Sequence, residues 1–230
     1  MENFAENLAR IRARIAAAAE RAGRDPAGVT LIAVTKNVDS ATVQEAVAAG
    51  VTDIGENRVQ EARAKFPMLP AGVRRHMIGH LQTNKVKQCL ELFDVIHSLD
   101  RLPLAEAISR RGQALGKVVP VLVQVNVAGE ETKHGLAPGE VLDFVRTVAE
   151  LPGLAVKGLM TMAPLVDDPE AARPVFRELR RLADAVADAG IRGVSMEWLS
   201  MGMSNDFEVA VEEGSTMVRI GTSLFGPRRA

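Results

Sequence analysis

Lys36 is the residue best placed for chemistry, because it closes the apolar run TLIAVTK at its C-terminal end. It is the only one of the seven lysines in such a position. Where parallel strands form a barrel, reactive groups stand at the C-terminal ends of the strands. A partly desolvated lysine amine there is a nucleophile toward carbonyl carbons, and an ion-paired lysine without chemistry is the alternative. We expect Lys65, Lys85 and Lys87, in polar helical stretches, to be solvated.

Two loops near the end of the sequence have the composition of an anion site. They are LSMGMSND (199–206) and IGTSLFG (220–226), and both combine small residues with hydroxyls. Small residues let backbone N–H groups approach an anion, and hydroxyls add further donors. The glycines could instead only close turns. Together, and opposite Lys36, the two loops predict a site for a carbonyl compound that carries a phosphate.

Two further polar residues accompany strand patterns. Arg219 lies inside MVRIG, where a buried guanidinium needs an acceptor. That acceptor is either a carboxylate such as Glu56 or the ring nitrogen of a cofactor, toward which arginine can only donate. Asn57 directly follows the second strand pattern. It could donate to a ring hydroxyl or cap the next helix.

The remaining reactive residue types form no recognisable constellation. His76 and His80 are four residues apart, the spacing of a helical zinc site. Within a strand, however, they would lie about 13 Å apart at roughly 3.3 Å per residue, too far to share a metal. Cys89 is expected to be a small buried side chain, and His97 and His134 have no partner at a diagnostic spacing.

Short apolar runs that alternate with helical stretches must position these residues. The predicted strands are Thr30–Thr35, Asp53–Gly55, His76–Gly79, Val95–Ser98, Pro120–Asn126, Val156–Met160, Glu197–Met201 and Met217–Gly221. The predicted helices include an N-terminal one that ends near Gly23, then Ser40–Ala49, Leu102–Leu115, Pro138–Glu150 and Pro169–Ala189. This alternation predicts a single (β/α)8 barrel with an extra N-terminal helix, as one domain over residues 1–230. A doubly wound open sheet is the alternative, but no G-x-G-x-x-G follows the first strand.

Composition excludes several classes of protein. The net charge of −1, from 28 basic and 29 acidic residues, gives no global field that would attract nucleic acid or an anionic membrane. One cysteine cannot form an internal disulfide, and no apolar run approaches the length of a membrane span. We therefore expect a cytoplasmic protein, and a monomer, because the sequence suggests no exposed apolar patch.

Five motifs in order make the chain resemble a known family. They are IAVTK, GENR, HMIGHLQTNK, LSMGMSNDF and STMVRIGTSLFG. These motifs are similar to those of the pyridoxal-phosphate homeostasis (YggS-type) family, and the resemblance runs from the N-terminal helix to Gly226. It implies a barrel like the N-terminal domain of alanine racemase. It also implies that pyridoxal 5'-phosphate (PLP) is held as a Schiff base on Lys36.

The resemblance carries over to particular residues. It places Ser200, Gly202, Gly221 and Thr222 around the phosphate and Arg219 at the pyridine nitrogen. Asn57 would lie near the ring, with His80 as a further neighbour. It implies a carrier or buffer that acts in vitamin B6 homeostasis and indirectly in amino-acid balance, with PLP and apo-forms of PLP-dependent enzymes as partners. No catalytic residues and no metal are expected.

The residues themselves agree with a non-catalytic role. An arginine donor at the ring nitrogen disfavours its protonation and weakens the electron sink of PLP. Racemisation tolerates this but needs a second base, and the sequence contains no tyrosine. The main alternative is a PLP-dependent racemase or lyase with an unrecognised acid/base, for which His80 and Cys89 are candidates. A further alternative is a cofactor-free Schiff-base aldolase on the same barrel.

Overall fold

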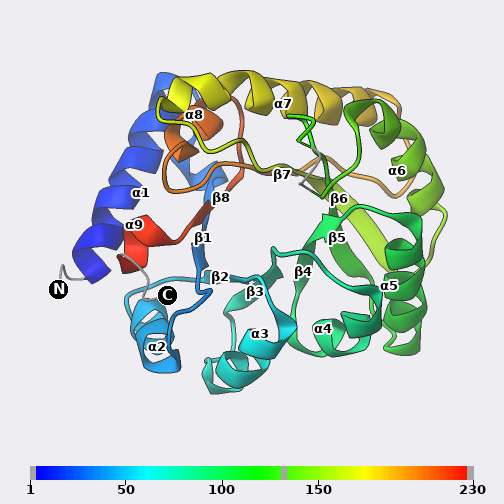
Figure 1. The fold of residues 1–230 in the computed structure, drawn as a ribbon, viewed down its shortest axis with the longest axis horizontal. Coiled ribbons are helices and arrows are strands. Elements are labelled where there is room, and N and C mark those ends of the chain that lie inside the picture. The colour runs from blue at the N-terminus through cyan, green and yellow to red at the C-terminus, as the bar shows by residue number, and fades with distance from the viewer. Residues whose placement is uncertain (1–3, 131–133, 227–230) are drawn as a thin grey trace.

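The computed structural model describes residues 4–130 and 134–226, and in them eight parallel strands close into a barrel with helices around it (Figure 1). Each strand pairs with the next along the chain, and β8 pairs back onto β1, with Thr30 opposite Met217. This closure confirms the (β/α)8 barrel and rules out the open sheet. The strands are β1 (Thr30–Val34), β2 (Asp53–Glu56), β3 (Arg74–Met77), β4 (Val95–Leu99), β5 (Val119–Gln124), β6 (Leu154–Met160), β7 (Trp198–Ser200) and β8 (Met217–Ile220).

The helices form an outer ring, and the first of them precedes the barrel as predicted. This helix, α1, lies beside α8 and α9 (Figure 1), and its Arg14 forms an ion pair with Glu208 of α8. None of the described helices is long and apolar enough to cross a membrane. The α-helices are α1 (Phe4–Arg21), α2 (Ser40–Ala48), α3 (Val59–Lys65), α4 (Val86–Leu92), α5 (Leu102–Ala114), α6 (Val141–Ala149), α7 (Arg173–Asp188), α8 (Phe207–Glu212) and α9 (Thr222–Phe225).

Some element boundaries differ from the predicted ones. The third strand begins at Arg74, two residues before the predicted start, because its first two residues are polar and did not continue the apolar run; Arg75 pairs with Asp94. The predicted helices that start at Pro138 and Pro169 open with a 3-10 turn before α6 and α7. Proline is readily accepted in such a first turn, because it lacks an N–H that would have no partner there.

Apolar packing holds the helices on the barrel. In α7, the apolar side chains Phe176, Leu179, Ala183 and Val186 share one face and are buried. Fully burying one such large side chain stabilises the fold by about 1.5–3 kcal/mol. The interior of the barrel is different, because buried charged and polar side chains from several strands meet there. They include Asp53, His76, His97, Ser200 and Arg219.

Candidate functional site at the mouth of the barrel

A cavity of about 440 Å³ opens at the C-terminal ends of the strands. Loops after β1, β2, β6, β7 and β8 line it, so residues far apart in the sequence face one another there. Five of the eight predicted site residues are among the lining: Lys36, Asn57, Arg219, Gly221 and Thr222. The other three, Ser200, Gly202 and His80, lie outside this lining.

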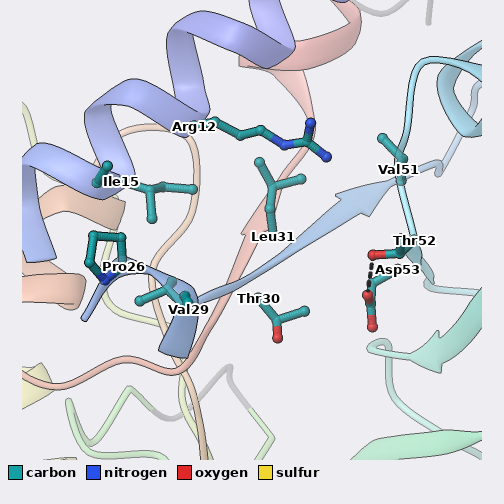
Figure 2. A pocket seen from close by; sticks show the side chains of 11 residues that line it. Arg12, Ile15, Pro26, Val29, Thr30, Leu31, Val51, Thr52 and Asp53 are labelled. Carbon is teal, nitrogen blue, oxygen red and sulfur yellow. Dashed lines mark hydrogen bonds between the residues drawn. The ribbon is translucent and has the colours of Figure 1, made fainter. Parts of the chain in front are cut away.

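A second cavity, also of about 440 Å³, lies at the opposite end of the barrel (Figure 2). It is bounded by α1 and by the first residues of β1 and β2, and Arg12 and Asp53 contribute polar groups. Strand ends on this side serve stability rather than chemistry in such barrels. This cavity also lacks a lysine in its lining, so the mouth is the better candidate for the functional site.

Lys36 stands at the mouth because β1 ends two residues earlier, at Val34, and a turn follows it. Asn37 adopts a left-handed conformation with φ of 57°, and its N–H donates to Glu61 Oε2 at 3.0 Å. Asparagine tolerates this region better than most residues. The Lys36 side chain is half-buried, and in the part of the chain that the structure describes its amine has no ion-pair or hydrogen-bond partner. An unpaired amine in a cavity is free to bind a ligand.

The prediction that Lys65 is solvated is wrong. Its side chain is buried, and its Nζ donates to Glu56 Oε1 at 2.7 Å and to the Thr35 carbonyl at 2.7 Å. Glu56 also accepts from the Thr35 hydroxyl at 2.7 Å. Burial raises the pKa of Glu56, and the bonds from Lys65 and Thr35 oppose that rise. Glu56 and Lys65 both bond to Thr35, so together they hold the residue directly before Lys36 in place. Another lysine, Lys133, lies outside the described residues.

Arg219 has other partners than the carboxylate considered from the sequence. Glu56 is paired with Lys65, so it is not the acceptor for Arg219. Instead, Arg219 donates to Ser200 Oγ at 2.6 Å and to the Thr161 carbonyl at 2.8 Å. Burial lowers the pKa of Arg219 to about 10, and the nearby charge of Asp206 opposes this. The guanidinium therefore stays charged near neutral pH at the floor of the cavity.

Ser200 and Gly202 support the floor of the cavity from below. Ser200 is fully buried, and its hydroxyl contacts both Arg219 and His97. The Gly202 carbonyl accepts from the Arg219 backbone N–H at 3.0 Å. Gly202 has φ of +94°, and a Cβ on it would lie 2.6 Å from the Cβ of Ala210. Only glycine fits this turn without a shift of α8.

One side of the cavity gathers hydrogen-bond donors. The backbone N–H groups of Gly221 and Ser223 both point at Ser204 Oγ, at 3.4 Å each. These bonds are long, so the donors are only weakly satisfied by that hydroxyl. Two backbone N–H groups that converge on one point suit an oxygen of an anion. Ser204 and Ser223 belong to the predicted anion loops, and Ser204 is the shared contact of the two loops.

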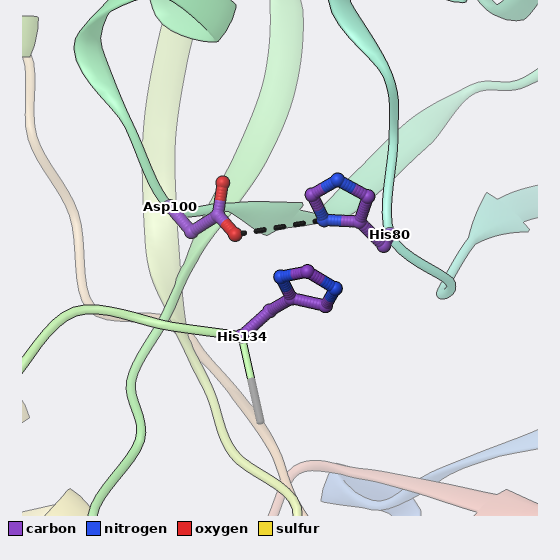
Figure 3. Close-up of side chains that lie close together, drawn as sticks. All are labelled: His80, Asp100 and His134. Atoms are coloured by element: carbon purple, nitrogen blue, oxygen red, sulfur yellow. Dashed lines mark ion pairs between the residues drawn. The ribbon is translucent and has the colours of Figure 1, made fainter. Parts of the chain in front are cut away.

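His80 stands at the mouth in a different group (Figure 3). Its ring stacks on that of His134, with centroids 3.8 Å apart and planes 16° apart. His80 Nδ1 lies 3.7 Å from Asp100 Oδ2. Burial and the neighbouring His134 lower the pKa of His80. The three side chains could offer ligand atoms within 4.8 Å of one another, but Asp100 is already paired with Arg101 at 2.6 Å.

The two other histidines and the cysteine lie away from the mouth. His76 and His97 are fully buried in the barrel and bond to each other, so His97 has a partner that sequence spacing did not indicate. Cys89 is buried within α4, as predicted, and burial strongly raises the pKa of its thiol. A buried neutral thiol is neither a base nor a nucleophile.

The barrel and this site agree with what comparisons with known proteins show. Residues 7–229 match the family model described as alanine racemase, N-terminal domain. The chain is 45% identical over 228 residues to the pyridoxal phosphate homeostasis protein of Aquifex aeolicus, covering 99% of both chains. It is 40% identical over 233 residues to the protein of that name from Escherichia coli, covering 99% of this chain and 98% of the other.

Comparison with solved structures supports the same fold and the same family. PipY of Synechococcus elongatus with PLP bound is 36% identical, with a TM-score of 0.84, and the match covers 97% of this chain and 100% of that chain. An alanine racemase from Clostridium difficile is only 16% identical, with a TM-score of 0.76 over 58% of its length, so it shares the fold alone. The chain therefore belongs to the alanine racemase N-terminal domain family and, within it, to the pyridoxal phosphate homeostasis proteins.

Proposed function

We propose that this protein binds PLP at the mouth of the barrel and acts as a carrier or buffer in PLP homeostasis. The observation that carries the proposal is one cavity with the unpaired Lys36 amine, the weakly satisfied N–H groups of Gly221 and Ser223, and the buried Arg219 guanidinium. An aldehyde, a phosphate and a ring nitrogen are the three groups that such a set of donors would recognise. The names of the curated relatives and the PLP bound to PipY point to the same ligand.

Each group of the cofactor has a fitting partner in the chain. Lys36 would hold the aldehyde carbon through its amine as a Schiff base. Gly221, Ser223 and the hydroxyl of Thr222 would bind the phosphate, with Ser204 beside them. Arg219 would donate to the ring nitrogen, while Asn57 would lie near the ring. Ser200 and Gly202, expected around the phosphate, would act from below by holding Arg219 and its loop.

The same residues favour storage over turnover. When bound, PLP supplies an electron sink that is strongest with a protonated pyridine ring. Arg219 keeps its protons and would only donate a hydrogen bond to the ring nitrogen. That nitrogen would then accept the bond and would not be protonated. Cys89 is buried away from the cavity, and the sequence contains no tyrosine, so His80 is the remaining candidate for the second base of a racemase. His80 lines a neighbouring cavity that shares Asn57 with the Lys36 cavity.

The mouth also suits release of a ligand. Leu165 on its rim is 87% exposed, and Lys36 is only half-buried. We infer that the cytoplasmic protein, acting as one domain and as a monomer, hands PLP to apo-forms of PLP-dependent enzymes. Transfer is testable by mixing the loaded protein with an apo-enzyme in the presence of a PLP trap. Reactivation that is no faster than with free PLP would contradict direct delivery, and light scattering would give the mass in solution.

Absorbance spectroscopy of the purified protein tests the site. With PLP, the wild type should show a visible band that survives dialysis, and Lys36→Ala should lose it. Lys87→Ala is the matched control, because it removes an exposed lysine outside the cavity lining and should keep the band. If Lys36→Ala keeps the band, or the wild type lacks it, the assignment of the site is wrong.

Deuterium exchange separates the carrier from the racemase or lyase alternative. A panel of amino acids is incubated in D₂O with the loaded protein, and deuterium at the α-carbon is measured by mass spectrometry. We expect no exchange above that of free PLP. Exchange that depends on both Lys36 and His80 would instead establish the enzyme. A cofactor-free aldolase would keep its activity in Arg219→Ala, whereas the carrier should retain PLP more weakly in that variant.

A further inference from the structure

A chain of four hydrogen bonds runs through the interior of the barrel from Arg219 to Asp53. Arg219 donates to Ser200 Oγ at 2.6 Å, and Ser200 Oγ lies 2.8 Å from His97 Nδ1. His97 Nε2 lies 2.9 Å from His76 Nδ1, and His76 Nε2 lies 2.9 Å from Asp53 Oδ1. All four contacts have the length of good hydrogen bonds. The five residues come from five strands: β2, β3, β4, β7 and β8.

This row of hydrogen bonds joins the two ends of the barrel. Arg219 lines the cavity at the mouth, and Asp53 lines the cavity at the opposite end (Figure 2). The three residues between them, Ser200, His97 and His76, have no exposed surface. Water therefore does not compete for their hydrogen bonds, and each polar atom depends on its neighbour in the chain.

Chemistry at the two ends fixes the direction of every bond. A guanidinium can only donate, so Ser200 Oγ accepts from Arg219. At the other end, an ionised carboxylate can only accept, so His76 Nε2 carries its proton toward Asp53. Although burial opposes it, the bonds from His76 and Thr52 hold the pKa of Asp53 below its usual value, which keeps that carboxylate charged.

The protons on the two histidines in the middle of this row of hydrogen bonds then have only one arrangement. A neutral His76 has a proton on Nε2 and accepts at Nδ1, so His97 donates from Nε2. His97 in turn accepts at Nδ1, and the Ser200 hydroxyl donates to it. Burial lowers the pKa of both histidines, which keeps them neutral. The opposite direction would need an additional proton in the core and would leave the Ser200 hydrogen without this acceptor.

We propose that Asp53, His76, His97 and Ser200 form a one-way hydrogen-bond relay that positions Arg219 for the ligand at the mouth. The inference rests on the proposed function, in which Arg219 faces the ring nitrogen of PLP. The relay gives the guanidinium a fixed acceptor, and it connects the guanidinium to a carboxylate at the far end of the barrel. These four side chains are positioning residues, because none of them lines the cavity at the mouth.

Imidazole NMR of the protein without PLP tests the relay directly. Long-range ¹H–¹⁵N spectra distinguish the tautomers of each histidine, and Gln substitutions of single histidines assign the signals. We expect both His76 and His97 to be neutral with the proton on Nε2. A proton on Nδ1 of either ring, or a charged ring at pH 7.5, would overturn the relay. This readout does not involve PLP, so it remains decisive if the proposed function fails.

Two variants test the effect on the site. Ser200→Ala removes the acceptor of Arg219 and should weaken PLP binding about tenfold, the usual loss for a hydrogen bond to a charged group. Asp53→Asn keeps the shape but removes the charge, and it should weaken binding about threefold and shift the absorbance band of bound PLP. Asp94→Asn is the matched control, because Asp94 pairs with Arg75 at the same end of the barrel and lies outside the relay.

The outcome separates a relay from a structural effect. If Asp53→Asn and Asp94→Asn change affinity and band position equally, Asp53 has no particular connection to Arg219, and the relay is overturned. Melting temperatures of the variants without PLP identify any general loss of stability. Absence of PLP binding by the wild type would refute the proposed function instead, and the NMR result would still decide whether the relay exists.

Discussion

His76 and His80 are four residues apart in the sequence and have opposite surroundings. His76 is fully buried and bonds to Asp53 and His97, with the two imidazole rings edge-on at 74°. His80 is exposed at the mouth and stacks on His134 (Figure 3). Directed hydrogen bonds in a dry core hold His76 against His97, whereas ring contact next to solvent holds His80 against His134.

The lysines repeat this difference between the interior and the mouth. Lys65 is buried against Glu56, while Lys36 is half-buried without a partner in the described part of the chain. In the interior, the side chains of Lys65, His76 and His97 all bond to other groups of the protein. At the mouth, groups of the same chemical types are left for a ligand. The partners of a side chain, rather than its type, therefore decide whether it serves stability or binding.

Lys65→Ala against Lys36→Ala should give the largest contrast in stability. Removing one partner of a buried ion pair leaves an uncompensated charge and typically costs about 3–5 kcal/mol. Lys36 has no such partner, so its loss should change the free energy of unfolding by less than about 0.5 kcal/mol. Urea denaturation of both variants without PLP measures this, and equal destabilisation would contradict the contrast.

His76→Ala against His80→Ala is expected to give the next largest contrast. The first variant leaves Asp53 and His97 without their shared partner and opens a cavity, which should cost about 3 kcal/mol. The second removes an exposed ring and should cost less than about 0.5 kcal/mol. The comparison fails if thermal or urea unfolding places the two variants at the same stability.

Acid should lower the free energy of unfolding through His76 and His97, by a smaller amount than these substitutions. Burial lowers the pKa of His76 and His97 from the usual 6.5. Below that pH the unfolded chain binds more protons than the folded one, so stability is complete above pH 6.5 and falls as the pH decreases. From pH 7.5 to 5.5 we expect a loss of about 2 kcal/mol from these two residues. A flat urea-unfolding profile over this range would show that they are not buried as neutral rings.

The barrel and the position of Lys36 could be predicted because their signals are local. Apolar periodicity marks each strand, and a lysine at a strand end needs no knowledge of its neighbours. The partners of Lys65, His97 and Arg219 come from other strands, and they depend on the register of the closed barrel. Sequence spacing contains no such information, so Lys65 was expected to be solvated, and Glu56 was one of two acceptors considered for Arg219.

Borohydride reduction followed by peptide mapping tests the central claim that the mouth, through Lys36, holds PLP. The wild-type protein is loaded with PLP, reduced and digested, and the modified peptide is identified by mass spectrometry. The account predicts one phosphopyridoxyl group on the peptide that contains Lys36, and none on the peptide with the buried Lys65. Modification of a different lysine, or none at all, would contradict it.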